Sequence, residues 1–324
     1  MRYFKYTLPI ALISTTIVGW GPVAAQAQTA YPSKPIKFVV GFAPGGPTDV
    51  ISRILGKRFS EVLNQPVLID NKPGADSLIA SKLVSQAEND GYSVLIASGS
   101  HTINPSLYPD TKLDPIKDFS PIGLIGDSPN FLVVNPAVPV TSVEELIAYA
   151  KKNPGKLNYA SSASTIYLQT ELFKSMANVN MTSIPYKGAG LALTSLLANE
   201  VQVSISSIVT LIQHVKSGKV RVLAVTSQKR SSLAPEVPTV NEKGLPGYAA
   251  STWYGMLTSP GVPSSVVLKL NTTLNKILEE SDVKNQLIAQ GLEPMPTSAQ
   301  EFTKFIAEDK EKWAKVVKES NAKQ

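Results

Sequence analysis

Apolar runs rich in valine, isoleucine and leucine alternate with amphipathic helical patterns along most of the chain. Such runs, when polar residues do not interrupt them, are typical of strands buried on both faces. They predict strands at 36–42, 67–70, 93–97, 122–125, 131–135, 182–185, 201–206, 220–226 and 254–258. Apolar residues at helical spacing predict helices at 48–63, 77–87, 143–152, 165–177, 189–199 and 208–217. This alternation predicts parallel β-α-β units and an α/β fold.

The C-terminal part of the chain follows a different pattern, with predicted helices at 263–280, 283–290 and 298–320 and no strand between them. Ser298 and Glu301 form a capping box at the start of the last helix. One apolar stripe runs along that helix, formed by Phe302, Phe305, Ile306, Trp313, Val316 and Val317. We expect this stripe to pack back on an earlier part of the fold, because an apolar helix face needs a partner.

Residues 1–27 have the features of a secretory signal peptide. Arg2 and Lys5 precede an apolar stretch, and Ala25-Gln26-Ala27 is a small-residue cleavage site. The alternative is a membrane anchor, but polar residues at 14–16 interrupt the stretch, which is shorter than the ~20 residues a span requires. No cysteine is present for lipidation. We therefore expect cleavage, export and a periplasmic mature chain.

Charge and cysteine content exclude several classes of function. The net charge is +6, and without Arg2 and Lys5 the chain keeps 29 basic against 25 acidic residues. These charges are scattered, which favours a solvated surface over a nucleic-acid or membrane site. The lack of cysteine excludes disulfides, a thiol nucleophile and thiolate metal sites.

The stretch FVVGFAPGGPTDVISRIL, at 38–55, joins a predicted strand to a predicted helix through two glycines and a proline. Gly45 and Gly46 let the backbone approach a ligand closely, and Pro47 suits the first helical position. The N–H groups of such a helix start favour an anion. A tight turn without a ligand is an equal alternative on this stretch alone. Neither the P-loop nor the dinucleotide fingerprint is present.

Four further corners resemble this one. They are Pro73-Gly74-Ala75 before a helix that Asp76 would cap, Ser98-Gly99-Ser100-His101, the serine-rich loop 161–165, and Lys187-Gly188-Ala189-Gly190. Each alone is a weak signal. Together they favour a small anionic ligand held by backbone N–H and hydroxyl groups.

Candidate catalytic residues are few. A Ser–His–acid triad using His101 is arithmetically possible, but the Gly-x-Ser-x-Gly elbow is absent, so a secreted serine hydrolase is disfavoured. His214 lies in a helical segment, and no histidine or cysteine spacing suggests zinc. We expect a protein that is not an enzyme, without cofactor or metal. His101 is expected to be a polar lining residue or a hydrogen-bonded loop residue.

A series of motifs spans the mature chain and resembles the Bug-type receptors, the periplasmic solute-binding proteins of tripartite tricarboxylate transport systems. The motifs are FAPGGPTD, NKPGADSLIASKLV, DGYSVLIA, INPSLY, DPIKDFSPIGLI, PYKGAG and VPTVNEKGLPGY, followed by Trp253-Tyr254-Gly255. The resemblance implies a two-domain, Venus-flytrap fold, each domain a mainly parallel sheet flanked by helices, with a ligand cleft between the domains. We expect the chain to cross between domains at 126–129 and 247–249. One domain would comprise 28–127 plus 249–324, and the other 128–248.

The resemblance also implies a ligand carboxylate held by backbone groups of two loops, one per domain, often through ordered water. The first loop comprises Phe42, Ala43, Pro44, Gly45 and Gly46, with Asp49 stabilising its helix start. The second comprises Ser161, Ser162, Ala163, Ser164 and Thr165. The flanking cleft residues are Ser98, Ser100 and His101 in the first domain and Lys187, Gly188 and Ala189 in the second.

Three positions depart from the family pattern. Asp76 and Ser77 replace a glycine pair, Tyr167 stands after the serine loop where a histidine is usual, and Ser206 or Ser207 replaces an aspartate. Asp76 could face the cleft, where it would favour a ligand with a cationic or hydroxyl group. A simple helix N-cap is the favoured alternative.

The resemblance implies a receptor that binds a small carboxylate and delivers it to the membrane subunits of a tripartite tricarboxylate-type transporter. A ligand-sensing input to a sensor kinase is the alternative, because it would use the same cleft. We expect a monomer that binds no nucleic acid. Backbone groups recognise only the carboxylate, so the sequence does not name the rest of the ligand.

Overall fold

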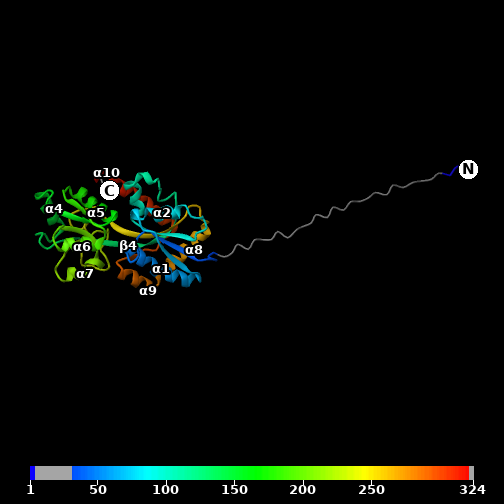
Figure 1. Cartoon of the computed structure of the whole chain (residues 1–324), viewed down its shortest axis with the longest axis horizontal. Helices are drawn as coiled ribbons and strands as arrows, with labels where there is room; N and C mark the ends of the chain where they lie inside the picture. The colour runs from blue at the N-terminus through cyan, green and yellow to red at the C-terminus, as the bar shows by residue number, and fades with distance from the viewer. Residues whose placement is uncertain (4–30, 321–324) are drawn as a thin grey trace. The chain divides into compact units, whose positions relative to one another are not determined.

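The computed structural model describes residues 1–3 and 31–320, and contacts group the sequence from Tyr31 onward into one compact unit (Figure 1). The predicted signal peptide, residues 1–27, lies outside the described residues except for its first three. Within the described ranges, no helix combines the length and the apolar character needed to cross a membrane.

The first strand group is built on three parallel strands. β1 (Ile36–Val40) pairs in parallel with β2 (Val67–Asn71) and with β3 (Ser93–Ser98). β9 (Ser251–Thr258) pairs antiparallel with β3, and the long strand β4 (Ser120–Val134) pairs antiparallel with β9. The two-residue strand β10 (Glu293–Pro294) also pairs with β4.

Helices cover both faces of this first group. Phe38 of β1 lies in a buried cluster with residues of α1 (Pro47–Leu63), α8 (Ser264–Glu279) and α9 (Ser281–Ala289). The next residue, Val39, lies in a different cluster with residues of α2 (Leu78–Ser85) and α10 (Ala299–Ser320). Successive strand residues point to opposite faces, so burial on both sides explains why β1 is a continuous apolar run.

The second strand group also combines parallel and antiparallel pairs. β5 (Asn158–Ser161) pairs in parallel with β6 (Thr182–Pro185) and with β7 (Val203–Ser207). β7 and β8 (Arg221–Val225) both pair antiparallel with β4. Figure 1 shows the helices α4, α5, α6 and α7 gathered around this group.

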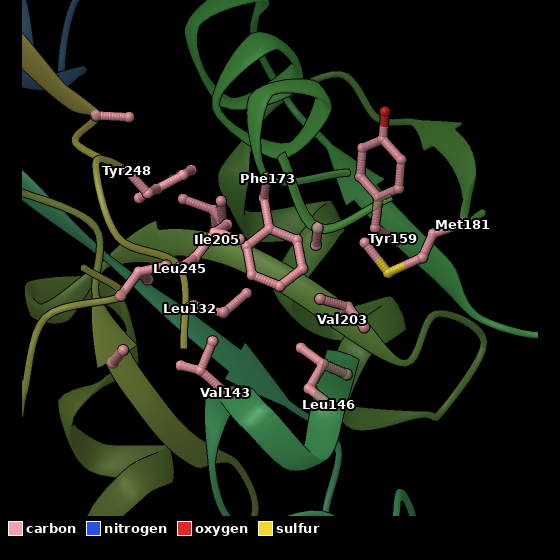
Figure 2. Packing of buried hydrophobic residues seen from close by; sticks show 14 of the residues in the cluster. Leu132, Val143, Leu146, Tyr159, Phe173, Met181, Val203, Ile205, Leu245 and Tyr248 are labelled. Atoms are coloured by element: carbon pink, nitrogen blue, oxygen red, sulfur yellow. The ribbon is translucent and has the colours of Figure 1, made fainter. Parts of the chain in front are cut away.

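These helices divide between the two faces of the second group. α4 (Val143–Lys152) and α5 (Ser164–Ala177) contribute to one buried cluster, and α6 (Ala189–Leu197) and α7 (Ile208–Lys216) contribute to the other. Figure 2 shows the first cluster, in which the Phe173 ring lies among strand residues that include Leu132 and Val203. Both groups are therefore three-layered, with helices on either side of the strands.

β4 is a single strand of 15 residues, and the prediction of two strands at 122–125 and 131–135 is wrong. The intervening Gly-Asp-Ser-Pro sequence is typical of a turn, but β9 pairs with it residue by residue, from Gly126 with Tyr254 to Pro129 with Ser251. Because β4 and β9 run antiparallel, the sheets are more mixed than the sequence predicts. The residues 126–129 thus lie inside β4, and residues 247–249 precede β9; the domain boundaries at these points stay a prediction.

The helix α3 (Ser100–Leu107) is missing from the predicted helices. Its first residues are polar, Pro105 stands near its end, and only Ile103 and Leu107 mark an apolar face. Two short 3-10 turns, Ala75–Ser77 and Pro109–Thr111, flank this region in the chain.

The last helix, α10, packs against both strand groups. The predicted capping box is confirmed: the Ser298 N–H donates to Glu301 Oε2 at 2.8 Å, and the Glu301 N–H donates to Ser298 Oγ at 3.1 Å. Phe302 belongs to the cluster under β1 and β3, whereas Trp313 belongs to the cluster under β7. The apolar stripe therefore joins two cores rather than one.

Candidate ligand-binding site

A cavity of about 980 Å³ lies at the carboxyl ends of parallel strands from both groups. Loops that follow β1, β3, β5, β6 and β7 contribute to its lining, together with residues of β4 and β9. In open α/β sheets, the carboxyl ends of the strands are where ligands bind. The position of the cavity therefore fits a small-molecule site.

Five helices begin at this cavity. The first residues of α1, α3, α5 and α6, and the Ser207 cap and Thr210 of α7, lie in its lining. The first N–H groups of a helix have no partner within the helix, and the helix dipole places partial positive charge at that end. Five such ends directed at one space create a region that attracts a negative group.

The side chains of the lining supply no positive charge. Among the described residues, no lysine, arginine or histidine lines the cavity, and Asp76 is the only carboxylic acid there. The remaining polar side chains are hydroxyls and amides, and aromatic rings such as Phe42 and Tyr186 cover other parts of the wall. Any attraction for an anion therefore comes from backbone and hydroxyl dipoles.

The loop between β1 and α1 is held in shape by Asp49. Its carboxylate accepts hydrogen bonds from the Gly45 N–H at 2.9 Å, from Arg53 Nε at 2.8 Å and Nη2 at 3.0 Å, and from Asn71 Nδ2 at 3.0 Å. Asn71 also donates to the Phe42 carbonyl at 3.1 Å. Arg53, and then the Gly45 and Asn71 donors, lower the pKa of Asp49 to about 2. Asp49 thus stays ionised and fixes the loop.

Gly45 has a structural part in this loop. Its φ of +85° lies in the left-handed region that disfavours side chains, and its N–H is donated to Asp49. Gly46 follows with φ −77°, begins the turn into α1, and lines the cavity. Gly46 and Thr48, rather than Gly45, therefore present the helix start to the cavity.

The loop between β5 and α5 presents a second helix start. Ser161, Ser164 and Thr165 are buried, and Ala163 is the N-cap residue with an extended backbone. The Ser164 hydroxyl donates a hydrogen bond to the carboxylate of Asp76, which comes from the turn before α2. This bond joins the two strand groups across the cavity wall.

Asp76 lines the cavity and does not cap α2, so the favoured N-cap prediction is wrong. The cap position belongs to Ser77, and in the described part of the chain no side-chain bond caps this helix. Asp76 itself has a left-handed backbone, φ 50° and ψ 49°, and its carbonyl accepts from Asn104 Nδ2 at 2.8 Å. Burial raises the pKa of Asp76, while the bond from Ser164 opposes that rise.

Most of the residues predicted for the site share this cavity. Those in its lining are Phe42, Ala43, Pro44, Gly46, Asp76, Ser98, Ser100, Ser161, Ser162, Ser164, Thr165, Gly188, Ala189 and Ser206. The structure places Gly45, Asp49, His101 and Lys187 outside the lining. A role of any of these residues in ligand binding stays a prediction.

His101 lies outside the cavity lining and is hydrogen-bonded, as the second alternative expected, although it lies in α3 and not in a loop. Its ring Nε2 lies 2.9 Å from the Pro115 carbonyl, and its ring meets Phe119 edge-on at 4.7 Å between centroids. Burial lowers the pKa of His101 to about 4, so the ring is neutral at physiological pH. Ser100, the first residue of α3, lines the cavity, and His101 lies about 100° further round the same helix, outside the lining.

Sequence reasoning missed several lining residues. Asn130 and Thr252 lie on β4 and β9, and Asn130 Nδ2 donates to Thr252 Oγ1 at 3.2 Å. A polar residue directly before the apolar run 131–134 was the available signal at 130. The rings of Tyr108, Tyr186 and Tyr254 gave no such signal, because tyrosine is common in cores. Among the described residues, no cluster of histidine, aspartate and glutamate side chains could hold a metal ion.

A mixed α/β unit with a ligand-sized cavity at the strand ends is the architecture of a periplasmic solute-binding protein. The sequence profile of the tripartite tricarboxylate transporter family receptor matches residues 51–322. The chain belongs to this family. Members are binding proteins, so the chain is a receptor and not an enzyme, and the hydrolase alternative falls away.

Individual relatives agree with this assignment. The protein BugT of Bordetella pertussis is 35% identical over 318 residues, covering 97% of this chain and 98% of the relative. An R. palustris protein solved with adipate is 36% identical, has a TM-score of 0.80, and covers 90% of this chain and 98% of its own. MatC of Rhodopseudomonas palustris, solved with bound malate, is 29% identical with a TM-score of 0.77, covering 89% and 100%.

Proposed function

We propose that this chain is the periplasmic receptor that binds a small carboxylate solute and delivers it to a tripartite tricarboxylate-type transporter. One observation carries the proposal: five helix N-termini open on a cavity whose lining has no basic side chain among the described residues. A carboxylate fits this arrangement, because it accepts several N–H and O–H bonds at once. The adipate and malate found in two relatives are carboxylates as well.

Binding without a basic side chain has a physical advantage for a receptor that must release its cargo. Dipoles at helix starts stabilise an anion without an ion pair that would have to be broken on release. The backbone donor at Thr48 comes from one strand group, and those at Thr165 and Ala189 come from the other. The ligand would favour a closed form because it gains contacts from both groups only when they approach each other.

The cellular setting follows from the same proposal. The signal peptide at 1–27 would direct export and be cleaved, leaving a periplasmic monomer. The two domains, 28–127 plus 249–324 and 128–248, would close on the solute through the segments at 126–129 and 247–249. The closed form would then dock on the membrane subunits of the transporter.

A thermal-shift panel of mono-, di- and tricarboxylates, aromatic acids and amino acids tests the proposal. A ligand at ~100 times its dissociation constant stabilises the folded protein by ~2.7 kcal/mol. We expect at least one carboxylate to raise Tm by several degrees, whereas its methyl ester does not. A flat response across the panel contradicts the proposal.

A valine substitution at the start of α1 and a matched valine control outside the cavity locate the site. A Cβ at Gly46 meets only the Ala43 carbonyl oxygen, at 3.5 Å, so Gly46→Val should fold while filling the helix start. We expect it to lose more than about 100-fold in carboxylate affinity because the branched side chain blocks the N–H groups. Ala314→Val, at an exposed position of α10 outside the cavity lining, is the control and should bind normally.

A further inference from the structure

Asp76 is the one formally charged side chain that the described residues contribute to the cavity lining. The position differs from a surface acid in two ways. Its carboxylate is directed at the start of α5, where the Ser164 hydroxyl donates to it. Among the described residues, no basic side chain in the lining offsets the charge.

The turn that carries Asp76 is a built feature. Ala75, Asp76 and Ser77 are three successive residues with positive φ, 46°, 50° and 75°. Such conformations are strained for residues with a side chain and persist only where the surroundings fix them. Here, Asn104 holds the Asp76 carbonyl at 2.8 Å, and the side chain of Ser77 occupies the space beside Gly41.

Gly41 makes this turn possible. A Cβ at Gly41 would lie 1.9 Å from Ser77 Oγ and 2.7 Å from Ser77 Cα, so any other residue there would push the turn away. The backbone of Ser77 cannot yield as a flexible side-chain end would. The chain therefore keeps a glycine at 41 and a strained turn at 75–77, and together they place the Asp76 carboxylate in the cavity wall.

The carboxylate of Asp76 accepts a hydrogen bond from Ser164, the first residue of α5, and so places its negative charge at that helix start. A carboxylate on the ligand cannot share that position, because two like charges would face each other in a partly desolvated space. The start of α1, at Gly46 and Thr48, carries no such acid in the lining, since Asp49 lies behind the loop. The two ends of the cavity thus differ in the sign of charge they accept.

We propose that Asp76 binds a cationic group of the ligand, so that the solute carries an ammonium group as well as the carboxylate. This inference rests on the proposed function and names its substrate class: amino acids rather than simple dicarboxylates. The ligand carboxylate lies at the start of α1, and the ammonium group contacts the Asp76 carboxylate from the cavity side, away from the start of α5. Burial raises the pKa of Asp76 because it disfavours the charged form. A ligand that displaces water from the carboxylate desolvates it further, so a positive group on the ligand is required to stabilise the charge.

Titration calorimetry with matched ligand pairs tests the assignment. The pairs are succinate with aspartate, glutarate with glutamate, adipate with 2-aminoadipate, and 3-phenylpropionate with phenylalanine, which differ only by the ammonium group. The wild-type protein should bind the ammonium-bearing member of at least one pair at least about 10-fold more tightly. In Asp76→Asn, the ratio of the two affinities within that pair should fall to near one. The acid without the ammonium group should bind this variant at least as tightly as it binds the wild type.

Two further variants control for side effects. Asp110→Asn removes an exposed acid outside the cavity and should leave the ratio unchanged. Ser164→Ala keeps the charge of Asp76 but removes its hydroxyl donor, so the ammonium preference should persist. Circular dichroism and Tm establish that each variant is folded.

The outcomes separate this inference from the proposed function. If the acids without ammonium bind at least as tightly as their partners, or if Asp76→Asn leaves a real preference intact, the assignment of Asp76 is overturned while the carboxylate receptor stands. If malate and aspartate bind with equal affinity both to the wild type and to Asp76→Asn, the charge of Asp76 does not contribute to ligand selection. The assignment of Asp76 is then overturned as well, and the carboxylate receptor stands. If no member of any pair and no other carboxylate binds, the proposed function itself fails.

Discussion

Two aspartates stand beside two helix starts of the same cavity, and their surroundings give them opposite properties. Asp49 lies behind the start of α1, outside the lining, and accepts four hydrogen bonds. Asp76 lies at the start of α5, in the lining, and among the described residues it accepts one, from Ser164. The pKa of Asp49 is lowered and that of Asp76 is raised.

The comparison teaches how a structural acid differs from one that is available to a ligand. The donors of Asp49 use its lone pairs, so nothing remains for a solute to contact. Asp76 keeps unused acceptor capacity and faces the space that a solute would fill. The number of donors, more than burial, separates the two roles.

The largest expected effect is the loss of stability in Asp49→Ala. Removing the carboxylate releases the Gly45 N–H and Asn71 and unpins the loop before α1. Hydrogen bonds to charged groups contribute about 1.5–3 kcal/mol each, so we expect the free energy of unfolding to fall by about 2–4 kcal/mol. Urea denaturation measures it, and a loss below about 0.5 kcal/mol would show that Asp49 does not hold the loop.

The two aspartates should also give opposite pH dependences. The pKa of Asp49 in the fold, about 2, lies below its ordinary 3.8, so its stabilisation is present above about pH 4 and is lost as the pH falls toward 2. The pKa of Asp76 is raised in the fold. Its contribution to the free energy of unfolding is therefore largest at pH values below the ordinary pKa of an aspartate, and it declines as the pH rises through the folded pKa.

Unfolding of wild type, Asp49→Asn and Asp76→Asn between pH 3 and 7 tests these signs. The advantage of wild type over Asp49→Asn should grow with pH, by about 1–2 kcal/mol. Its advantage over Asp76→Asn should shrink with pH or become a disadvantage. If the free energies of unfolding of Asp49→Asn and Asp76→Asn depend on pH in the same way, the two aspartates do not have opposite pH dependences.

At neutral pH, Asp76→Asn should change stability little. The substitution removes a partly desolvated charge and keeps a side chain that accepts from Ser164, so we expect a change within about 1 kcal/mol, in the stabilising direction. Thermal unfolding without ligand measures it. A destabilisation as large as that of Asp49→Ala would mean that Asp76 is a structural acid as well.

The effect expected of Ser164→Ala on stability is of the same small order as that of Asp76→Asn. Ser164 is the first residue of α5 and Ala163 is its N-cap, so the substitution removes the bond to Asp76 and not a helix cap. We expect a loss of about 0.5–1.5 kcal/mol in the free energy of unfolding. A larger loss would indicate that the bond between the two strand groups supports the fold itself.

Much of the fold follows from the sequence, because periodicity encodes burial. The starts of α1 and α4, the capping box of α10 and most strands lie within a few residues of the predictions. β4 was misjudged because a Gly-Asp-Ser-Pro turn signal was overruled by pairing with β9, some 125 residues later in the chain. Pairing over such distances leaves no local trace.

The site was predictable where glycine and serine precede a helix, and less so elsewhere. Gly46 and Ser161 were predicted from such corners and lie in the lining, whereas Ser206, also in the lining, was named only through the family resemblance. His101 was misplaced because its direction depends on a helix that the apolar pattern hides, and Tyr254 was missed because its position depends on β9. The conformation of Asp76 could not be predicted, since three successive positive φ values follow from Asn104 and Gly41, not from local preference.

The central claim, that helix starts without basic side chains hold a carboxylate, is tested most directly by comparing an acid with its uncharged amide. The carboxylate that gives the largest thermal shift and its primary amide would be titrated calorimetrically into the wild-type protein at pH 7. The account predicts that the acid binds at least about 100-fold more tightly than the amide, because the dipoles favour the negative charge. Equal affinities for the acid and the amide would contradict it.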